Sequence, residues 1–320
     1  MVELGYALSS EEHGPLDLVR YASLAEDSGF DFAVISDHFH PWISHQANSP
    51  FVWSVLGGIA MATRRIAIGT AVTCPIRRYH PVIVAQAAAT AAAMFEGRFM
   101  LGLGSGEALN EHITGEYWPV PSVRIRMLEE AIEIIRALWT GEEVNHDGQY
   151  FTVHQARVFT LPAENPPIIV ASTGPASASL AAENDGIMLT APNDAALRTF
   201  SRHGGAGKPR FGQLAISWAP DDATARRNAF EWWPTSVIGG ALNSEVNSPA
   251  LYDEIVKLAD EDMVAKAMPC SSRPEVFLEA IRAYADAGVT HVCLHPVGPD
   301  QDGFMEFFRR ELAPVVARAA

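Results

Sequence analysis

The sequence lacks the features that would place it in a membrane or in a secreted, disulfide-rich class. No apolar run approaches the ~18 residues that a membrane-spanning helix needs. The N-terminus has no basic start followed by an apolar stretch, so we expect no signal peptide. The three cysteines, Cys74, Cys270 and Cys293, stand at unrelated spacings that favour a reducing cytosol over a disulfide framework. We therefore expect a cytoplasmic protein.

Positive charge is also scarce. The chain has 23 basic residues against 38 acidic ones, and its formal net charge is −15. Such a surface repels nucleic acid and anionic lipid, and no cluster of basic residues offsets it. We expect the partner of this chain to be a small-molecule substrate, and neither nucleic acid nor a membrane.

What the sequence does contain is a regular alternation of short β-rich runs and amphipathic helical stretches over its 320 residues. Helices are expected over stretches such as 16–27, 82–95 and 124–138. Parallel strands with helical returns predict a (β/α)₈ TIM barrel, with residues 1–320 forming a single domain. The expected strands are 3–7, 32–36, 66–72, 99–103, 168–171, 186–190, 213–217 and 291–295.

Two insertions interrupt the predicted barrel. After the fourth strand and its helix, residues 142–153 indicate a hairpin around Asp147-Gly148. After the seventh strand, residues 231–269 are too many for a plain connection and include Trp232, Trp233 and a helical stretch from Leu251. We expect this second insertion to form a cap or wall near the active site, although its tryptophans are equally compatible with simple packing.

Catalytic groups in barrels of this class come from the carboxyl ends of the strands, so polar residues after each strand are the candidates. The second strand is followed by Asp37, His38 and Trp42. A histidine here can act as a general base near neutral pH, with Asp37 orienting a neighbouring group. Trp42 offers a flat face for an aromatic cofactor or a developing cation. A structural histidine and a packed tryptophan would give the same pattern.

A metal site is the rival interpretation of the same segment. The spacing His38-x-His40 is similar to the metal-binding pair of amidohydrolases. Zinc would need further ligands at other strand ends. His295 ends the eighth strand without an Asp beside it, and the fifth and sixth strands end in Ser172 and Thr190. We therefore expect no metal.

Two loops are candidates for holding phosphate. The loop after the fourth strand alternates glycines up to Glu107, and such glycines let backbone amides approach an anion closely. Glu107 would then lie at the barrel mouth, where burial raises a carboxyl pKa. The loop after the fifth strand places Thr173 and Gly174 before a helix, an arrangement that suits either an N-cap or an anion. Two such loops together favour a phosphate-bearing cofactor over an isolated tight turn.

Two motifs carry a resemblance to a known family. Residues 36–42 read SDHFHPW, and residues 101–111 read LGLGSGEALNE. Together with IGTAVTCP at residues 68–75, they resemble the F420-dependent glucose-6-phosphate dehydrogenase family, which is part of the bacterial luciferase-like flavin and deazaflavin barrels. The resemblance covers nearly the whole chain. It implies bound coenzyme F420, a deazaflavin that moves hydrides, and a homodimer.

The resemblance also implies roles for individual residues. His38 would be the base that takes the hydroxyl proton as hydride leaves the substrate carbon. Trp42 would stabilise the developing charge, and Glu107 would assist protonation at the deazaflavin ring. Glu11 matches an acidic residue that faces the substrate pocket. The first three side chains would be catalytic, and Glu11 would line the substrate pocket.

On the coenzyme side, Ala71-Val72 matches the position of a non-prolyl cis peptide that backs the ring in this family. Such a bond is rare because it costs ~3–4 kcal/mol. Asp37 would contact the coenzyme. The residues that would hold its phosphate are Ser105, Gly106, Thr173 and Gly174.

The chain departs from the family where the sugar phosphate would bind. A family lysine after the sixth strand is absent, since residues 189–193 read LTAPN, and an expected arginine position is occupied by Ala267. We therefore expect an F420-dependent dehydrogenase or reductase acting on a neutral, more apolar alcohol or carbonyl rather than on glucose 6-phosphate. The alternatives are an FMN-dependent monooxygenase of the same fold and a non-catalytic deazaflavin-binding protein.

Overall fold

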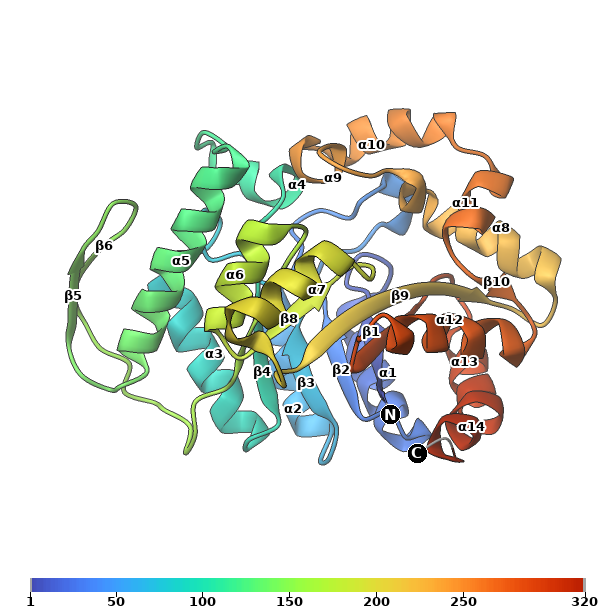
Figure 1. Ribbon diagram of the computed structural model, residues 1–320, viewed down its shortest axis with the longest axis horizontal. Helices are drawn as coiled ribbons and strands as arrows, with labels where there is room; N and C mark the ends of the chain where they lie inside the picture. Colours follow the sequence, from blue (N-terminus) through green and yellow to red (C-terminus); the bar gives the residue numbers. More distant parts are fainter. Residues whose placement is uncertain (1, 319–320) are drawn as a thin grey trace.

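The computed structural model describes residues 2–318 as a closed barrel of parallel strands surrounded by helices (Figure 1). Each strand pairs with the next around the ring, and β11 pairs with β1 to close it. The predicted (β/α)₈ TIM barrel is therefore confirmed. In ring order the strands are β1 (Glu3–Leu8), β2 (Phe32–Ile35), β3 (Ala67–Thr70), β4 (Phe99–Leu103), β7 (Ile168–Ala171), β8 (Gly186–Leu189), β9 (Arg210–Trp218) and β11 (His291–Pro296).

The barrel interior is filled by side chains from alternate strand positions. Phe32 of β2 lies in a small buried cluster with Met100 and Phe211, whereas the neighbouring Ala33 belongs to the larger core between strands and helices. Gly5 of β1 pairs with Phe32, and a Cβ at Gly5 would lie 2.2 Å from the Phe32 ring. Because the interior is packed in this way, any chemistry has to take place at the barrel mouth.

The outer helices follow the strands, and several of them begin with proline. Proline suits the first helical position because its missing N–H would have no partner there. Among residues 2–318 no helix is both long and apolar enough to cross a membrane. The helices of the outer ring are α1 (Pro15–Ser28), α2 (Val52–Ala62), α3 (Pro81–Phe95), α5 (Pro121–Leu138), α6 (Pro175–Glu183), α7 (Asp194–Phe200), α12 (Pro274–Asp286), α13 (Gln301–Phe307) and α14 (Ala313–Arg318).

Two expected strands differ from the structure by more than one residue at an end. The third strand was expected over residues 66–72 but ends at Thr70, one residue before the cis peptide bond between Ala71 and Val72. The seventh was expected over residues 213–217 but begins at Arg210, because its first residues pair with both neighbours, Ile187 of β8 and His291 of β11. The remaining strands differ from expectation by at most one residue.

The hairpin expected over residues 142–153 is present as β5 (Val144–Asp147) and β6 (Thr152–Ala156), which pair antiparallel. It extends three residues further than expected and stands away from the barrel, at the left of Figure 1. The hairpin is attached to α5, where the Glu130 carboxylate accepts hydrogen bonds from the backbone of Tyr150 and Phe151. It contributes nothing to the barrel mouth.

Residues 231–269, here called the cap segment, begin with the last two residues of α8 (Asp222–Trp232) and lie above the barrel beside α4 (Ala108–Glu111) (Figure 1). The segment contains α9 (Leu242–Glu245), α10 (Pro249–Ile255) and α11 (Glu261–Ala267). The helical stretch expected from Leu251 begins at Pro249, because the Ser248 side chain caps it. The segment leads to a short strand that was not predicted, β10 (Cys270–Ser271), which pairs with the end of β9.

Candidate active site

The carboxyl ends of β1 to β4 bring the three predicted catalytic side chains together. Glu11 follows β1, His38 and Trp42 follow β2, and Glu107 follows β4 directly before α4. Neighbouring parallel strands end at the same rim, so residues far apart in the sequence meet there. The result is a histidine that lies between two carboxylates and beside an indole ring.

His38 is oriented by contacts to both of its ring nitrogens. Its Nδ1 lies 3.2 Å from Glu11 Oε1 and 3.2 Å from the carbonyl oxygen of His40. Because both neighbours of Nδ1 are hydrogen-bond acceptors, the proton of the neutral imidazole is assigned to Nδ1. Its Nε2 lies 3.7 Å from Glu107 Oε2. The nitrogen with the free lone pair therefore faces Glu107 at the barrel mouth. In the neutral ring, Nε2 is therefore the nitrogen that is free to accept a proton.

The two carboxylates beside His38 have pKa values shifted in opposite directions. Burial favours the neutral form of Glu11, but the neighbouring His38 and the Ser36 hydroxyl, which donates at 2.6 Å, outweigh it and lower the pKa. For Glu107, burial raises the pKa, and the nearby Glu11 charge adds to the effect. Glu11 therefore stays ionised and orients the imidazole, while Glu107 is the more readily protonated partner. Opposite shifts of this kind are typical of paired carboxyls with different roles in acid–base catalysis.

Trp42 forms the aromatic wall of the site. The centroid of its ring lies 5.1 Å from that of His38, within the distance at which an aromatic ring stabilises a cation. On its other side it packs perpendicular to Tyr252 of α10, with ring centroids 5.4 Å apart. Trp42, Tyr252, Ile43 and Ile238 belong to one apolar cluster, so the cap segment fixes the indole from above.

Asp37 is enclosed by hydrogen-bond donors from the loop after β3. Its Oδ2 accepts from the Thr73 hydroxyl at 2.7 Å. Its Oδ1 accepts from the Arg78 guanidinium at 2.9 Å and from the Tyr79 hydroxyl at 3.3 Å. The carboxylate has no exposed surface. Within the described residues Asp37 thus links the loop of His38 to the next loop, and its predicted contact with the coenzyme stays a prediction.

Arg78 is shared between Asp37 and a second buried acid. Glu111 of α4 accepts a hydrogen bond from the Arg78 backbone at 2.8 Å, and its Oε1 lies 3.5 Å from Arg78 Nε. Burial raises the pKa of Glu111 to about 7, against the opposing charge of Arg78. Burial also opposes the charge of Arg78, but Asp37 and Glu111 outweigh it and raise the pKa of the guanidinium. The three side chains form one buried ion cluster under the barrel mouth.

The loop after β4 packs so closely on its neighbours that glycine is required. Gly106 has φ of 75°, and a Cβ there would lie 2.5 Å from Cys74 Sγ. A Cβ at Gly104 would lie 2.5 Å from a methyl group of Val72 and 3.6 Å from Ala171. The loops after β3, β4 and β7 therefore meet at the glycine loop. The cis peptide bond expected between Ala71 and Val72 is present at this point.

Two loops present free backbone donors at the predicted phosphate positions. Within residues 2–318, the backbone N–H groups of Ser105, Gly106, Thr173 and Gly174 have no protein hydrogen-bond partner. Leu103 of β4 pairs with Val170 of β7, so the two loops lie on adjacent strand ends. Adjacent sets of free N–H groups, one of them at the N-terminus of α6, are suited to bind an anion. The residues present therefore fit a phosphate-bearing cofactor.

The sequence matches the model of the luciferase-like monooxygenase family over residues 2–291. This chain belongs to the luciferase-like family. Its relatives include proteins named F420-dependent glucose-6-phosphate dehydrogenase from Nocardia farcinica and Gordonia bronchialis, each 37% identical, with 98% of this chain and 97% of the relative covered. The predicted resemblance is therefore confirmed.

Two solved structures are similar to this chain over nearly its full length. An F420-dependent secondary alcohol dehydrogenase in complex with an F420-acetone adduct is 31% identical and has a TM-score of 0.91, covering 98% of this chain and 99% of that chain. A coenzyme F420-dependent tetrahydromethanopterin reductase from Methanopyrus kandleri is 23% identical with a TM-score of 0.80, covering 98% and 99% of the two chains. The second match shows a shared fold.

Sequence reasoning missed two residues of this luciferase-like site. Arg78 was assigned no role because nothing in the local sequence shows that it reaches Asp37. Asn110 lies inside the quoted motif LGLGSGEALNE, yet only the structure shows that its side chain contacts both the loop of His38 and Glu107. The sequence signal that was available is the place of Asn110 shortly after the glycine loop; in the structure this polar side chain is buried on the very short helix α4.

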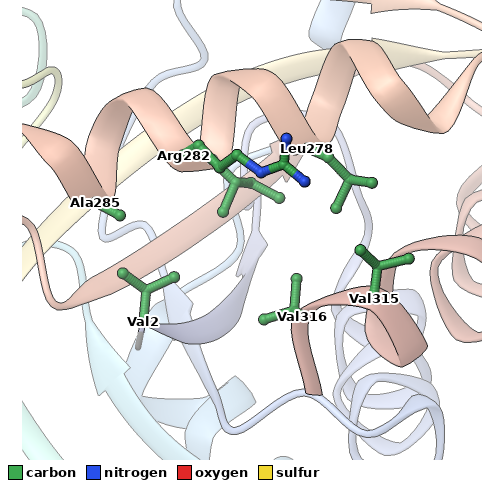
Figure 2. A pocket seen from close by; sticks show the side chains of 7 residues that line it. Val2, Leu278, Arg282, Ala285, Val315 and Val316 are labelled. Atoms are coloured by element: carbon green, nitrogen blue, oxygen red, sulfur yellow. The ribbon is translucent and has the colours of Figure 1, made fainter. Parts of the chain in front are cut away.

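An apolar pocket at the opposite end of the luciferase-like barrel is unrelated to the chemistry. Figure 2 shows it between α12 and α14, with Val2, Leu278 and Val316 among the lining side chains. Val2 precedes the first residue of β1, so the pocket lies at the amino ends of the strands. None of the predicted catalytic or coenzyme residues lines it. The candidate active site is therefore the mouth formed by the strand carboxyl ends.

Proposed function

We propose that this protein is a coenzyme F420-dependent oxidoreductase that transfers a hydride between F420 and an alcohol or its carbonyl counterpart. The observation that carries the proposal is the position of His38 between Glu11 and Glu107, beside the Trp42 ring. Oxidation of an alcohol requires a base at the hydroxyl group and a second group that handles a proton at the acceptor. The relatives named above, which match the chain over nearly its full length, support the same cofactor.

The roles of the side chains follow from their geometry. His38 Nε2 takes the proton from the substrate hydroxyl as hydride leaves the carbon. Glu11, held ionised, stabilises the resulting imidazolium through Nδ1, and the face of Trp42 adds a cation–π contribution of ~1–2 kcal/mol. Glu107, whose pKa is raised by burial, donates or accepts the proton at the deazaflavin ring. In the reverse direction His38 returns its proton to the carbonyl oxygen, and Glu107 would take back the proton from the ring.

When bound, coenzyme F420 supplies the hydride acceptor. Ser105, Gly106, Thr173 and Gly174 would hold its phosphate through their free N–H groups. The Ala71-Val72 peptide would support the ring, and Asp37 would keep the supporting loop in place through Thr73 and Arg78.

The substrate is a neutral alcohol or carbonyl rather than a sugar phosphate. The loop after β8 contains no lysine, since residues 189–193 read LTAPN. Lys257 of the cap segment is exposed and pairs with Glu254, so it does not replace the missing cation. The cap places Ile238 and Tyr252 against the Trp42 ring, which makes this side of the mouth apolar. The related alcohol dehydrogenase whose structure holds an F420-acetone adduct is consistent with a small secondary alcohol.

The proposal is tested by titrating the purified protein with F420 and with FMN while following fluorescence quenching. We expect saturable F420 binding and no comparable binding of FMN. A panel of secondary alcohols should then reduce bound F420, whereas glucose 6-phosphate should not. Tight FMN binding without F420 binding would support a monooxygenase of the same fold instead. Binding of F420 with no reduction by any alcohol and no oxidation by any carbonyl would favour the non-catalytic alternative.

Replacement of Gly106 by alanine is expected to weaken F420 binding at least ~10-fold, because the added Cβ displaces the loop that presents the N–H groups. The clash is with Cys74 Sγ at 2.5 Å. Gly115→Ala is the matched control, since Gly115 has a similar φ of 77° and no atom within 4 Å of an added Cβ. Both variants should lose ~1 kcal/mol of stability from backbone strain, but only the first should lose affinity. Equal affinities would contradict the role of the Gly106 loop.

We further propose that the protein acts in the cytoplasm as a homodimer and that residues 1–320 form one domain with the cap segment over the site. The three cysteines are free thiols, which supports a reducing compartment. The outer helices α2 and α3 expose Met61, Ile83 and Met94, which supports association of two copies. Light scattering during size-exclusion chromatography tests the dimer, since a monomeric mass at micromolar concentration would contradict it.

A further inference from the structure

The side chain of Asn110 connects the two halves of the catalytic group. Asn110 lies on α4 and is 3% exposed. Its Oδ1 accepts hydrogen bonds from the backbone N–H groups of Phe39 at 2.8 Å and His40 at 3.1 Å. Its Nδ2 donates to Glu107 Oε2 at 3.2 Å. One buried amide therefore contacts both the residues that follow His38 and the carboxylate that faces it.

We propose that Asn110 is a positioning residue that sets the spacing of His38 and Glu107 and the ionisation of Glu107. The oxygen that receives the Asn110 hydrogen bond, Glu107 Oε2, is also the one that lies 3.7 Å from His38 Nε2. The other carboxylate oxygen has no protein partner within residues 2–318 and is left for the reacting groups. The catalytic consequence rests on the proposed function; the effect on Glu107 does not.

A second contact makes the connection rigid. His40 Nδ1 lies 2.9 Å from the carbonyl oxygen of Leu109, the residue before Asn110. The loop of His38 is thus held to α4 by the amide of Asn110 and by the backbone next to it. A side-chain amide has an acceptor and a donor on one carbon, so it can join two N–H groups to a carboxylate. Asparagine meets this need, whereas aspartate would place a second negative charge beside Glu107.

Several groups affect the ionisation of Glu107. Within the described residues, only Asn110 donates a hydrogen bond to the Glu107 carboxylate. Burial raises the pKa of Glu107, and the Asn110 hydrogen bond lowers it. Loss of that hydrogen bond should therefore raise the pKa, and an added carboxylate should raise it further. The titratable or charged groups that face Glu107 are His38, Glu11, Arg78, Cys74 and Tyr252.

The experiment is a ¹³C NMR pH titration of glutamate-labelled protein without coenzyme, with the Glu107 signal assigned by its loss in Glu107→Gln. Asn110→Ala should raise the midpoint by about one pH unit, and Asn110→Asp by more. Asn110→Asp keeps the acceptor for the loop N–H groups, so it should stay folded if the alanine variant does not. The control is Asn145→Asp, because Asn145 is exposed on the hairpin and also accepts from a backbone N–H. It should leave the midpoint unchanged.

The catalytic readout is separate. With an alcohol that wild type oxidises, Asn110→Ala should lower kcat at least ~10-fold while the F420 Kd changes less than about threefold. The pH profile of kcat should shift to higher pH by the same amount as the NMR midpoint of Glu107. A Glu107 midpoint in Asn110→Asp within about 0.3 pH unit of wild type would overturn the inference. If no alcohol is oxidised at all, the proposed function fails, but the NMR titration still decides the role of Asn110.

Discussion

His38→Ala is expected to lower turnover by ~10²-fold or more while the Kd for F420 changes less than about threefold. In the proposed mechanism the ring is the base that acts through Nε2, and its nitrogens contact Glu11, His40 and Glu107. Its removal therefore affects proton transfer much more than coenzyme binding. Pre-steady-state reduction of bound F420, followed by absorbance, measures the step directly.

The matched control for His38 is His154→Ala. His154 is exposed on the hairpin away from the mouth, so its loss should leave turnover and affinity unchanged. High concentrations of imidazole should restore part of the activity of His38→Ala, because a diffusible base can occupy the vacated space. Unchanged turnover in His38→Ala would remove this residue from the role of base. A loss of F420 binding equal to the loss of turnover would instead indicate that the imidazole supports the coenzyme.

Arg78→Met is expected to lower the free energy of unfolding by ~3–5 kcal/mol near neutral pH, because it leaves buried carboxylates without their counter-charge. Arg78 is 7% exposed, and its partners Asp37 and Glu111 are 0% and 1% exposed. A methionine side chain of similar length fills the space but donates no hydrogen bond. Urea denaturation measures the change, and Arg65→Met, at an arginine 71% exposed, should alter stability by less than ~0.5 kcal/mol.

The cost of Arg78→Met should depend on pH in a defined direction. With Arg78 present, burial already raises the pKa of Glu111 to about 7. Without Arg78 the folded-state pKa rises further, so the folded protein holds a proton that the unfolded chain releases. Stability that depends on a raised carboxyl pKa is greatest at low pH and falls as the pH increases. The variant should therefore be closest to wild type near pH 5 and weakest near pH 8. An equal cost at both pH values would contradict the role of Glu111.

The barrel was predictable because its strands carry strong local signals. Segments such as 99–103 and 168–171 are short apolar runs next to glycine or proline, and buried parallel strands have this pattern. β10 was not predictable in the same way, since Cys270 and Ser271 form a strand only through pairing with the end of β9. The end of the third strand at Thr70 was likewise not visible, because residues 66–72 form a continuous β-prone run in the sequence.

The candidate catalytic residues could be named from motifs, but the contacts that support them could not. His38, Trp42 and Glu107 lie in two recognisable segments, whereas Arg78 and Asn110 act through neighbours that are 41 and 71 positions away in the chain. Residue periodicity contains no information on such pairs. Their discovery required the distances between loops, which only the assembled barrel provides.

The cap segment has a consequence for how substrate range can change over time. It contacts the loop after β2 through Ser44 with Asp253, Gln46 with the Trp232 carbonyl, His45 with Glu231 and Trp232, and the apolar packing on Trp42. The proton-handling groups are instead held by barrel loops and α4. Evolution or protein engineering can therefore exchange much of residues 231–269 and change the alcohols accepted, provided that the packing of Ile238 and Tyr252 on Trp42 is kept.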